Sequence, residues 1–325
     1  MNKKLKSILK ITLPLLLGVA LAWYSLSKIS LKVLVEHFKN VNYVWISLGL
    51  LFGFLSHLSR AYRWKFMIEP LGYTLRLPNS IMAVFATYLV NYTIPRAGEI
   101  TRATIVTNYE GVPFEKGFGT IVAERVADLV MLFAIILVAL FLEFEFIYNF
   151  FIDRFNPYKI AIVILAIVIA AILFFFFIKR STSKYALKIK SFVVGLIEGI
   201  LSIFKMKQKW AFILHTLFIW AMYLLMFYVT TFSIKETSGI PIAAILIGFI
   251  AASFSIAATN GGIGSYPVAV FAAFAIFDIP EEPSIAFGWI MWSSQTLMVV
   301  LLGGLSLIYL PIYNRTHKKK HTKVS

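Results

Sequence analysis

The sequence predicts an all-α polytopic membrane protein, and three observations lead to this fold class. Hydrophobic residues make up 60% of the 325 residues, charged residues make up only 14%, and the mean hydropathy is +0.83. A soluble globular protein has an apolar share of roughly 45–50% and a charged share of about 25%. The apolar residues also form long runs, as membrane-spanning helices require. A water-soluble globule is therefore excluded. A disordered chain is excluded too, because 30 Phe, 15 Tyr and 7 Trp must be buried or face lipid.

Six apolar runs are long enough to cross a bilayer, whose hydrocarbon core of about 30 Å needs about 20 helical residues. Full crossings are expected at residues 8–26, 44–66, 118–142, 158–178, 210–232 and 284–311. The first run also resembles a secretory signal peptide, because lysines precede it and Ala20 and Ala22 have the spacing of a cleavage site. We expect an uncleaved first helix, with cleavage as the alternative.

Two further apolar regions are interrupted, and we expect each to enter the membrane and return as a re-entrant hairpin. Residues 80–107 are broken around 95–99, and residues 240–277 are broken around 260–267. The shorter arm of each region has about ten residues and rises only about 15 Å, half of the hydrocarbon core. The alternative treats both regions as pairs of crossings, which gives ten membrane passes in all.

The basic residues indicate which loops face the cytoplasm. Lys and Arg number 31 against 15 Asp and Glu, and the excess is concentrated at the two termini and in residues 60–78 and 179–209. The positive-inside rule places these segments, and so both termini, in the cytoplasm. The loop 27–43 falls outside in this topology and disagrees by a small positive excess. Nucleic acid is not an expected partner, because no folded aqueous domain is available to read a groove.

The two hairpins divide the chain into repeats of opposite orientation. The first repeat, at about 44–142, and the second, at about 210–311, each consist of a span, a hairpin and a span. Inverted repeats whose broken helices meet near the membrane midplane recur in transporters. We therefore expect a single integral membrane domain over residues 1–325. Between the repeats, residues 184–204 predict an amphipathic helix on the inner leaflet, with a seventh crossing as the alternative.

Ionisable residues inside the apolar regions are the main functional candidates, because each costs on the order of 2.5–3.5 kcal/mol unless it is paired or faces water. The candidates are Arg96, Glu99, Arg102, Glu124, Arg125 and Asp128. Three bases and three acids can cancel as an ion-pair network that holds the first hairpin to the next helix. The interpretation that we favour turns one or both arginines of the first break toward an anionic headgroup, because a guanidinium grips phosphate bidentately and stays ionised.

The second break supplies candidates for the other half of a substrate site. They are Asn260, Gly261, Gly262 and Tyr266. Glycines allow close approach of the backbone and can expose amides to an anion. A sharp turn without a binding role is the alternative. The residues expected to shape the two turns are Pro95, Gly98, Gly264 and Pro267.

Other polar and small residues are expected to have structural roles. Arg60 and Arg63 are predicted to anchor the second span at the cytoplasmic interface, with substrate contact as the alternative. Gly49 and Gly53 form a G-x-x-x-G motif, which is typical of helix packing. The chain has no Cys, and its histidines form no ligand set, so neither a metal nor a cofactor is expected.

Three motifs carry a resemblance to a known family. They read Ile94-Pro95-Arg96-Ala97-Gly98-Glu99-Ile100-Thr101-Arg102-Ala103, Glu124-Arg125-Val126-Ala127-Asp128-Leu129 and Asn260-Gly261-Gly262-Ile263-Gly264. In this order they resemble the flippase-like family, the membrane region of lysylphosphatidylglycerol synthase, which also occurs as stand-alone bacterial membrane proteins. The resemblance covers nearly the whole chain. It implies movement of a phospholipid or related amphiphile between the leaflets of the bacterial cell (inner) membrane. The signature positions that it implies are Pro95, Arg96, Gly98, Glu99, Arg102, Glu124, Arg125 and Asp128.

Two departures from the family pattern bear on function. Asn260 stands where the family has a proline, and Ser265-Tyr266-Pro267 replaces an acidic ending, which suggests that the second break reads a different headgroup. No soluble aminoacyl-transfer domain follows Ser325, so catalysis of lipid lysylation is not expected.

We therefore expect a lipid flippase-like transporter without an enzymatic step. Its expected partners are membrane lipids, and a separate lipid-modifying enzyme is an alternative partner. A secondary transporter of a small anionic metabolite and a non-catalytic membrane scaffold are the alternative functions. The chain contains no G-x-x-x-x-G-K-[ST] motif, so transport would be downhill, coupled to an ion or powered by a partner.

Overall fold

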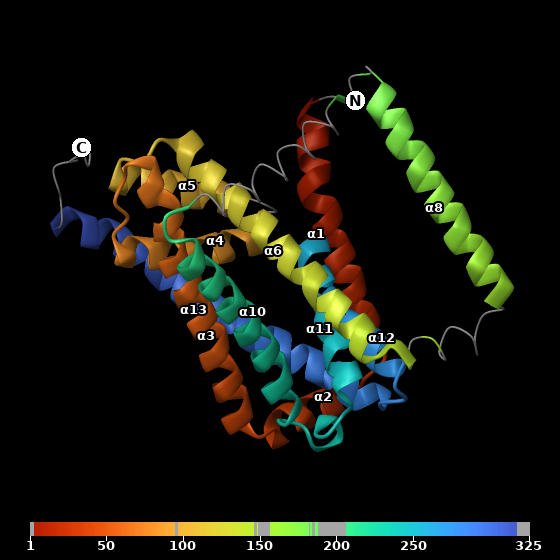
Figure 1. Ribbon diagram of the computed structural model, residues 1–325. Coiled ribbons are helices and arrows are strands. Elements are labelled where there is room, and N and C mark those ends of the chain that lie inside the picture. The colour runs from red at the N-terminus through yellow and green to blue at the C-terminus, as the bar shows by residue number, and fades with distance from the viewer. Residues whose placement is uncertain are drawn as a thin grey trace. The chain divides into compact units, whose positions relative to one another are not determined.

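The described part of the chain is helical. The computed structural model describes residues 3–94, 97–145, 148, 157–181, 183, 186–187 and 206–316 (Figure 1). Its α-helices are α1 (Lys3–Ser27), α2 (Leu31–Asn40), α3 (Tyr43–Ile68), α4 (Leu77–Thr93), α5 (Ala97–Glu110), α6 (Phe114–Leu142), α8 (Pro157–Arg180), α10 (Lys209–Thr231), α11 (Ile242–Ala258), α12 (Ser265–Ala275) and α13 (Glu281–Thr316). Two 3₁₀ turns are η1 (Glu69–Leu71) and η2 (Lys235–Thr237).

The helices confirm the predicted all-α membrane fold. Among the described residues, four stretches are long and apolar enough to cross a bilayer: Tyr43–Leu71, Phe114–Leu142, Lys209–Thr231 and Glu281–Arg315. The pair Leu15–Ser27 and Leu31–Asn40, bent by 85°, counts as a fifth if it is one span. The remaining expected crossing, 158–178, coincides with α8, several of whose side chains lie outside the described set. A helix therefore occupies each of the six expected spans.

Helix α2 forms where the sequence analysis placed only a loop, at residues 27–43. Ser30 caps its N-terminus, because the Ser30 hydroxyl accepts a hydrogen bond from the Val33 amide at 3.2 Å. Leu34 is buried, whereas Lys32 and Glu36 are exposed. This apolar-polar pattern has helical spacing, and ten residues are enough for a short amphipathic helix once a cap starts it.

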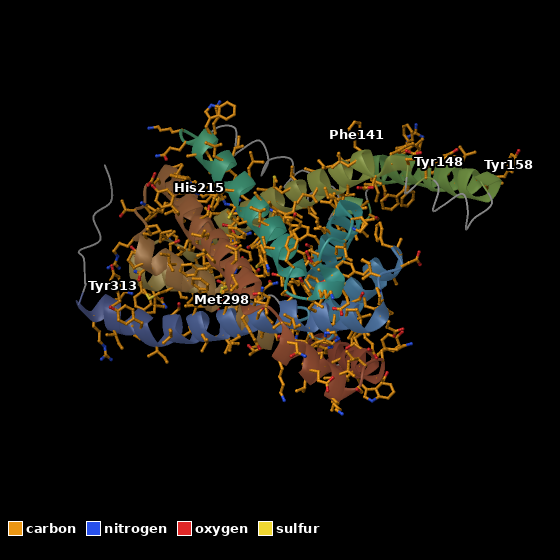
Figure 2. The ribbon with its side chains drawn as sticks, turned by 90° about the horizontal axis from the view of Figure 1, so that it is seen from below. Phe141, Tyr148, Tyr158, His215, Met298 and Tyr313 are labelled. Atoms are coloured by element: carbon orange, nitrogen blue, oxygen red, sulfur yellow. The ribbon has the colours of Figure 1, made fainter. Side chains whose placement is uncertain are left out.

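Helices α3 and α10 pack closely because α3 presents small residues to α10. A Cβ on Gly49 would lie 2.5 Å from the Thr230 hydroxyl, and one on Gly53 would lie 2.7 Å from the Met226 sulfur. The same added Cβ on Gly53 would lie 3.4 Å from Cε of Met298, which Figure 2 labels on α13. The prediction that this G-x-x-x-G motif serves helix packing is thus confirmed.

Each interrupted apolar region forms two helices separated by a break. In the first region α4 ends at Thr93 and α5 begins at Ala97, and the second break, between α11 and α12, lies at residues 259–264. The second is a turn of glycines with positive φ, at +61° for Gly261, +80° for Gly262 and +66° for Gly264. The order of long helix, broken pair and long helix occurs twice, once from α3 to α6 and once from α10 to α13.

Helix α13 runs beside both broken pairs, as Figure 1 shows. A Cβ on Gly303 would lie 2.8 Å from the Phe85 carbonyl of α4, and one on Gly288 would lie 2.6 Å from Pro267 Cα of α12. The absence of side chains at these two positions brings the α13 backbone against one arm of each pair. The 36-residue helix therefore joins the two repeats.

The chain divides into two compact units, residues 1–121 with 206–325 and residues 122–205. The contacts given above for α3, α4 and α10–α13 all belong to the first unit. The second unit holds the C-terminal part of α6 and helix α8, where large apolar side chains such as Phe141 and Tyr158 are 84% and 79% exposed (Figure 2). Such exposure suits lipid rather than water. The amphipathic helix expected at 184–204 lies almost entirely outside the described residues.

Candidate functional site

The two breaks meet in the first unit. Tyr92, in the last turn of α4, packs against Gly261 of the second break, where an added Cβ would overlap the tyrosine ring and come within 3.0 Å of its Cζ. Gly261 therefore has to lack a side chain for the two segments to approach this closely. The sequence analysis expected the broken helices to converge, and this contact brings them together.

Polar side chains of α13 hold this contact in place. Thr296 donates a hydrogen bond to the Tyr92 hydroxyl at 3.1 Å, and the Trp292 indole N–H donates to the Gly261 carbonyl at 2.9 Å. Tyr266, which is only 3% exposed, lies within hydrogen-bonding reach of Gln295. One face of α13 thus binds the first break through Tyr92 and the second break through Gly261 and Tyr266.

Asn260 is buried in the second break with an unused amide. It is 3% exposed, and neither its Oδ1 nor its Nδ2 has a hydrogen-bond partner in the described part of the chain. A buried polar group without a partner costs about 1–3 kcal/mol. The structure therefore keeps a donor and an acceptor available at the position where the family motif has a proline.

Glu99 lies at the start of α5 and turns back toward α4. Asn91 links the two helices, because its Oδ1 accepts from the Gly98 amide at 2.8 Å and its Nδ2 donates to Glu99 Oε1 at 3.4 Å. The buried Oε2 of Glu99 has no hydrogen-bond partner among the described residues. An added Cβ on Gly98 would overlap the Thr87 carbonyl, which explains why a glycine stands there. Pro95 and Arg96 lie outside the described residues.

Arg102 is buried against α3. It is 1% exposed, and its guanidinium carbon lies 3.9 Å from the centre of the Trp64 ring, close enough for a strong cation–π contact. Trp64 is itself fixed, because its indole N–H donates to the Thr120 hydroxyl at 2.8 Å. Among the described residues the Glu99 carboxylate contacts Asn91, and the Arg102 guanidinium faces an aromatic ring.

Arg60 and Arg63 are not the interface anchors that the sequence predicted. They are 3% and 0% exposed, whereas a snorkelling arginine keeps its guanidinium in water. Arg63 Nη1 donates to the Thr216 hydroxyl at 2.6 Å, and its guanidinium lies 5.0 Å from the centre of the Phe212 ring. Helix α10 supplies both partners, so its packing against α3 lets the arginine be buried. Beside them, the Ser59 hydroxyl lies 2.8 Å from Nδ1 of His215, which Figure 2 labels on α10.

In the second unit, Arg125 bridges two carboxylates of α6. Its Nη2 lies 3.1 Å from Glu124 Oε1, and its Nη1 lies 3.6 Å from Asp128 Oδ2. Glu124 is fully buried, and Asp128 is 9% exposed. Acid and base therefore pair within this motif on one helix. Its joining with the charges of the first break into one network stays a prediction.

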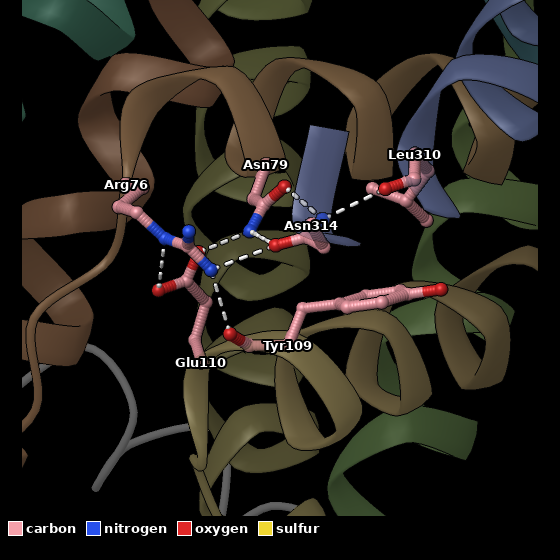
Figure 3. A network of polar contacts seen from close by, with 6 residues as sticks. All are labelled: Arg76, Asn79, Tyr109, Glu110, Leu310 and Asn314. Atoms are coloured by element: carbon pink, nitrogen blue, oxygen red, sulfur yellow. Dashed lines mark hydrogen bonds and ion pairs between the residues drawn. The ribbon is translucent and has the colours of Figure 1, made fainter. Parts of the chain in front are cut away.

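A second polar network ties the far ends of the first hairpin to α13. Arg76 Nε donates to both oxygens of Glu110 at 3.0 and 3.2 Å, and Arg76 Nη2 donates to the Asn314 side chain at 2.7 Å (Figure 3). Asn79 donates to Glu110 and exchanges hydrogen bonds of 2.8 and 2.9 Å with Asn314. Since these groups satisfy one another, the network is a structural clamp rather than a binding site.

Sequence reasoning missed Tyr92, Trp292, Gln295 and Thr296, which join the breaks to α13. It also missed Asn91, which links α4 to α5. Asn91 and Tyr92 were visible as polar residues in an apolar arm, and residues 293–296 form a polar stretch, Ser-Ser-Gln-Thr, inside an apolar span. Polar side chains inside membrane helices usually hydrogen-bond across helices, and that signal could have identified this face.

Comparison with known proteins identifies related chains. The model of the family described as "Lysylphosphatidylglycerol synthase TM region" matches residues 11–304. The UPF0104 membrane protein MJ1595 of Methanocaldococcus jannaschii is 25% identical over 329 residues, which cover 92% of this chain and 93% of that protein. No solved structure matches the chain.

Proposed function

The chain belongs to the family of the lysylphosphatidylglycerol synthase TM region, and on that premise we propose that it is a lipid flippase-like transporter. The proposed substrate is a phospholipid or a related anionic amphiphile, moved between leaflets without an enzymatic step. The proposed location is a bacterial inner membrane, with both termini in the cytoplasm. These proposals start from the family and from the site geometry.

The contact between Tyr92 and Gly261 carries the proposal. It brings the broken helices of the two repeats into contact. Many transporters form their substrate site inside the bilayer where broken helices meet in this way. Unwound backbone at membrane depth is tolerated where it is buried in protein or lines a watery cavity. A polar headgroup could cross there while the acyl chains stay in lipid.

The polar groups of the two hairpins suit a headgroup with a phosphate. Arg96 and Arg102 of the first hairpin are the proposed phosphate ligands, and Asn260 with Tyr266 would contact the rest of the headgroup. Asn260 Nδ2 is an unused donor, and a phosphate or hydroxyl oxygen could accept a hydrogen bond from it. The sequence also predicts substrate binding by Glu124, Arg125 and Asp128 of α6, and that assignment stays a prediction.

Leaflet-resolved lipid assays in reconstituted vesicles test the proposal. Fluorescent phospholipid is incorporated symmetrically, and the fraction that an outside quencher reaches is followed over time. Wild type should expose the inner-leaflet lipid faster than empty vesicles do. Arg96→Ala should lose most of this rate, because the phosphate loses a bidentate partner.

The control is Arg180→Ala, which removes an exposed arginine at the end of α8. Equal rates for wild type and Arg96→Ala would count against the assignment. If vesicles instead take up a small anion and leave lipid in place, the secondary-transporter alternative is favoured. If neither lipid nor the anion moves, and cells keep the protein's phenotype when Glu99 and Arg102 are replaced, the scaffold alternative is favoured.

A further inference from the structure

The second break gathers three oxygen atoms from the two helices that it separates. The Thr259 hydroxyl donates to the Ser255 carbonyl at 2.9 Å and lies 2.7 Å from the Ser265 hydroxyl. The Ser265 hydroxyl lies 3.4 Å from the same carbonyl. Ser255 and Ser265 are 8% and 7% exposed, so the group is buried. The end of α11 and the start of α12 thus contribute oxygens to one small cluster.

This cluster has more acceptor capacity than protons. The two hydroxyls and the Thr259 amide, which donates to the Ser255 carbonyl at 3.1 Å, supply three protons, and the three oxygens together offer about six lone pairs. With the Thr259 proton on the Ser255 carbonyl, the Ser265 proton can serve only one of the other two oxygens. The cluster also lies at the C-terminus of α11, where the helix dipole is negative. A positive charge is therefore favoured there.

The side chain of Asn260 offers a further oxygen in the same break. It follows Thr259 directly, it is 3% exposed, and its Oδ1 and Nδ2 have no hydrogen-bond partner in the described part of the chain. Leaving a buried amide without a partner is costly, and a cation bound at Oδ1 would remove the part of that cost that belongs to the acceptor. A neutral amide oxygen is a common ligand for a hard cation.

We propose that Ser255, Thr259, Asn260 and Ser265 form a binding site for a monovalent cation, of which Na⁺ is the probe. The ligands are a carbonyl, two hydroxyls and an amide, all neutral, whereas sites for Ca²⁺ and Mg²⁺ draw on carboxylates. Helix α1 packs directly against this break, because Gly264 contacts the backbone of Gly18 and Ala22. Cation binding does not depend on lipid being the substrate. The coupling of that cation to transport rests on the proposed function.

Thermal unfolding of the full chain in detergent tests the site. Tm is measured in increasing NaCl, sodium gluconate and choline chloride, each at the same ionic strength. Both sodium salts should raise Tm in a saturable way, and choline chloride should not. Thr259→Val and Asn260→Leu should each raise the half-saturating Na⁺ concentration at least tenfold, because each removes a ligand oxygen.

Three further variants keep the test decisive if those two fold poorly. Thr259→Ser keeps the hydroxyl and should respond to Na⁺ as wild type does. Asn260→Asp adds a negative charge and should lower the half-saturating concentration at least tenfold. Ser253→Ala is the matched control, because its hydroxyl lies on the same helix and bonds only to the Phe249 carbonyl at 2.8 Å.

The proposal is overturned if choline stabilises the protein as Na⁺ does, or if stabilisation follows the anion. It is also overturned if Asn260→Asp weakens the Na⁺ response, or if Thr259→Val and Asn260→Leu respond like wild type. Lipid assays with and without a Na⁺ gradient then separate the two proposals. A chain that binds Na⁺ but moves no lipid retains the site and loses the proposed function.

Discussion

Thr296 donates a hydrogen bond of 3.1 Å to the hydroxyl of Tyr92, and this bond ties the first break to α13. Gly261 also packs on the Tyr92 ring. Two residues of the second repeat, Thr296 and Gly261, therefore contact one tyrosine of the first repeat. The ring fills the space between the breaks. Changes that enlarge or displace it are expected to affect stability before they affect any ligand.

Gly261→Ala should destabilise the protein by about 2–5 kcal/mol. The residue has φ of +61°, which costs an L-residue roughly 1–2 kcal/mol, and the new methyl overlaps the Tyr92 ring, for which overpacking adds roughly 1–3 kcal/mol. Equilibrium denaturation in detergent measures the change. Gly239→Ala is the control, because φ there is +84° and nothing lies within 4 Å of the added Cβ. Equal losses for the two variants would contradict the close contact.

Gly49→Ala should weaken the packing of α3 on α10. The added Cβ would lie 2.5 Å from the Thr230 hydroxyl, and such overpacking typically costs about 1–3 kcal/mol. Gly304→Ala, where no atom lies within 4 Å, should instead leave stability unchanged or raise it by up to about 1 kcal/mol through helix propensity. Tm in detergent micelles distinguishes them, and a neutral Gly49→Ala would refute the role of this motif in packing.

Thr216→Val should destabilise the protein by about 1.5–3 kcal/mol. The hydroxyl accepts a charged hydrogen bond from the fully buried Arg63, and valine has the same shape without the acceptor. Thr216→Ser should restore most of the loss. Thr104→Val serves as the control, because Thr104 is exposed and its hydroxyl bonds to the Ile100 carbonyl of its own helix. The idea fails if both valine variants unfold alike.

Asn314→Ala should cost about 1–3 kcal/mol by depriving Asn79 of a donor and an acceptor and Arg76 of an acceptor. The loss should be non-additive with Asn79→Ala, because both variants break the same pair. A double-mutant cycle in detergent measures the coupling energy, with Asn40→Ala at the exposed end of α2 as the control. Additive losses would show that the clamp in Figure 3 is not a unit.

The helices and the two breaks could be predicted from the sequence, because apolar run length and helix rise decide what fits a bilayer. Ten residues are too short to cross, and a run that contains Pro95 or three glycines cannot continue as one helix. Helix α2 was missed, since loop 27–43 was assessed by its charge and not by its periodicity. A cap at Ser30 and one buried Leu34 were enough to form it.

The candidate site was predictable in part, because motifs show which residues are unusual but not what they contact. Arg63 was assigned to an interface since it lies at the predicted cytoplasmic end of the second span. Its partner, Thr216, is 153 positions away on another helix. Tyr92 looked like an ordinary residue of an apolar arm, and only the close approach of Gly261 gives it a role. Such pairings arise from tertiary packing, which no local pattern encodes.

The length of α13 makes the bilayer itself a variable for this protein. Its 36 residues rise about 54 Å, well beyond the roughly 30 Å of the hydrocarbon core, so it must slant steeply or emerge into the headgroups. Thinner membranes would increase that mismatch and thicker ones would relieve it. Helix α13 contacts both breaks. A change in acyl-chain length would therefore change the tilt of α13 and move both breaks with it.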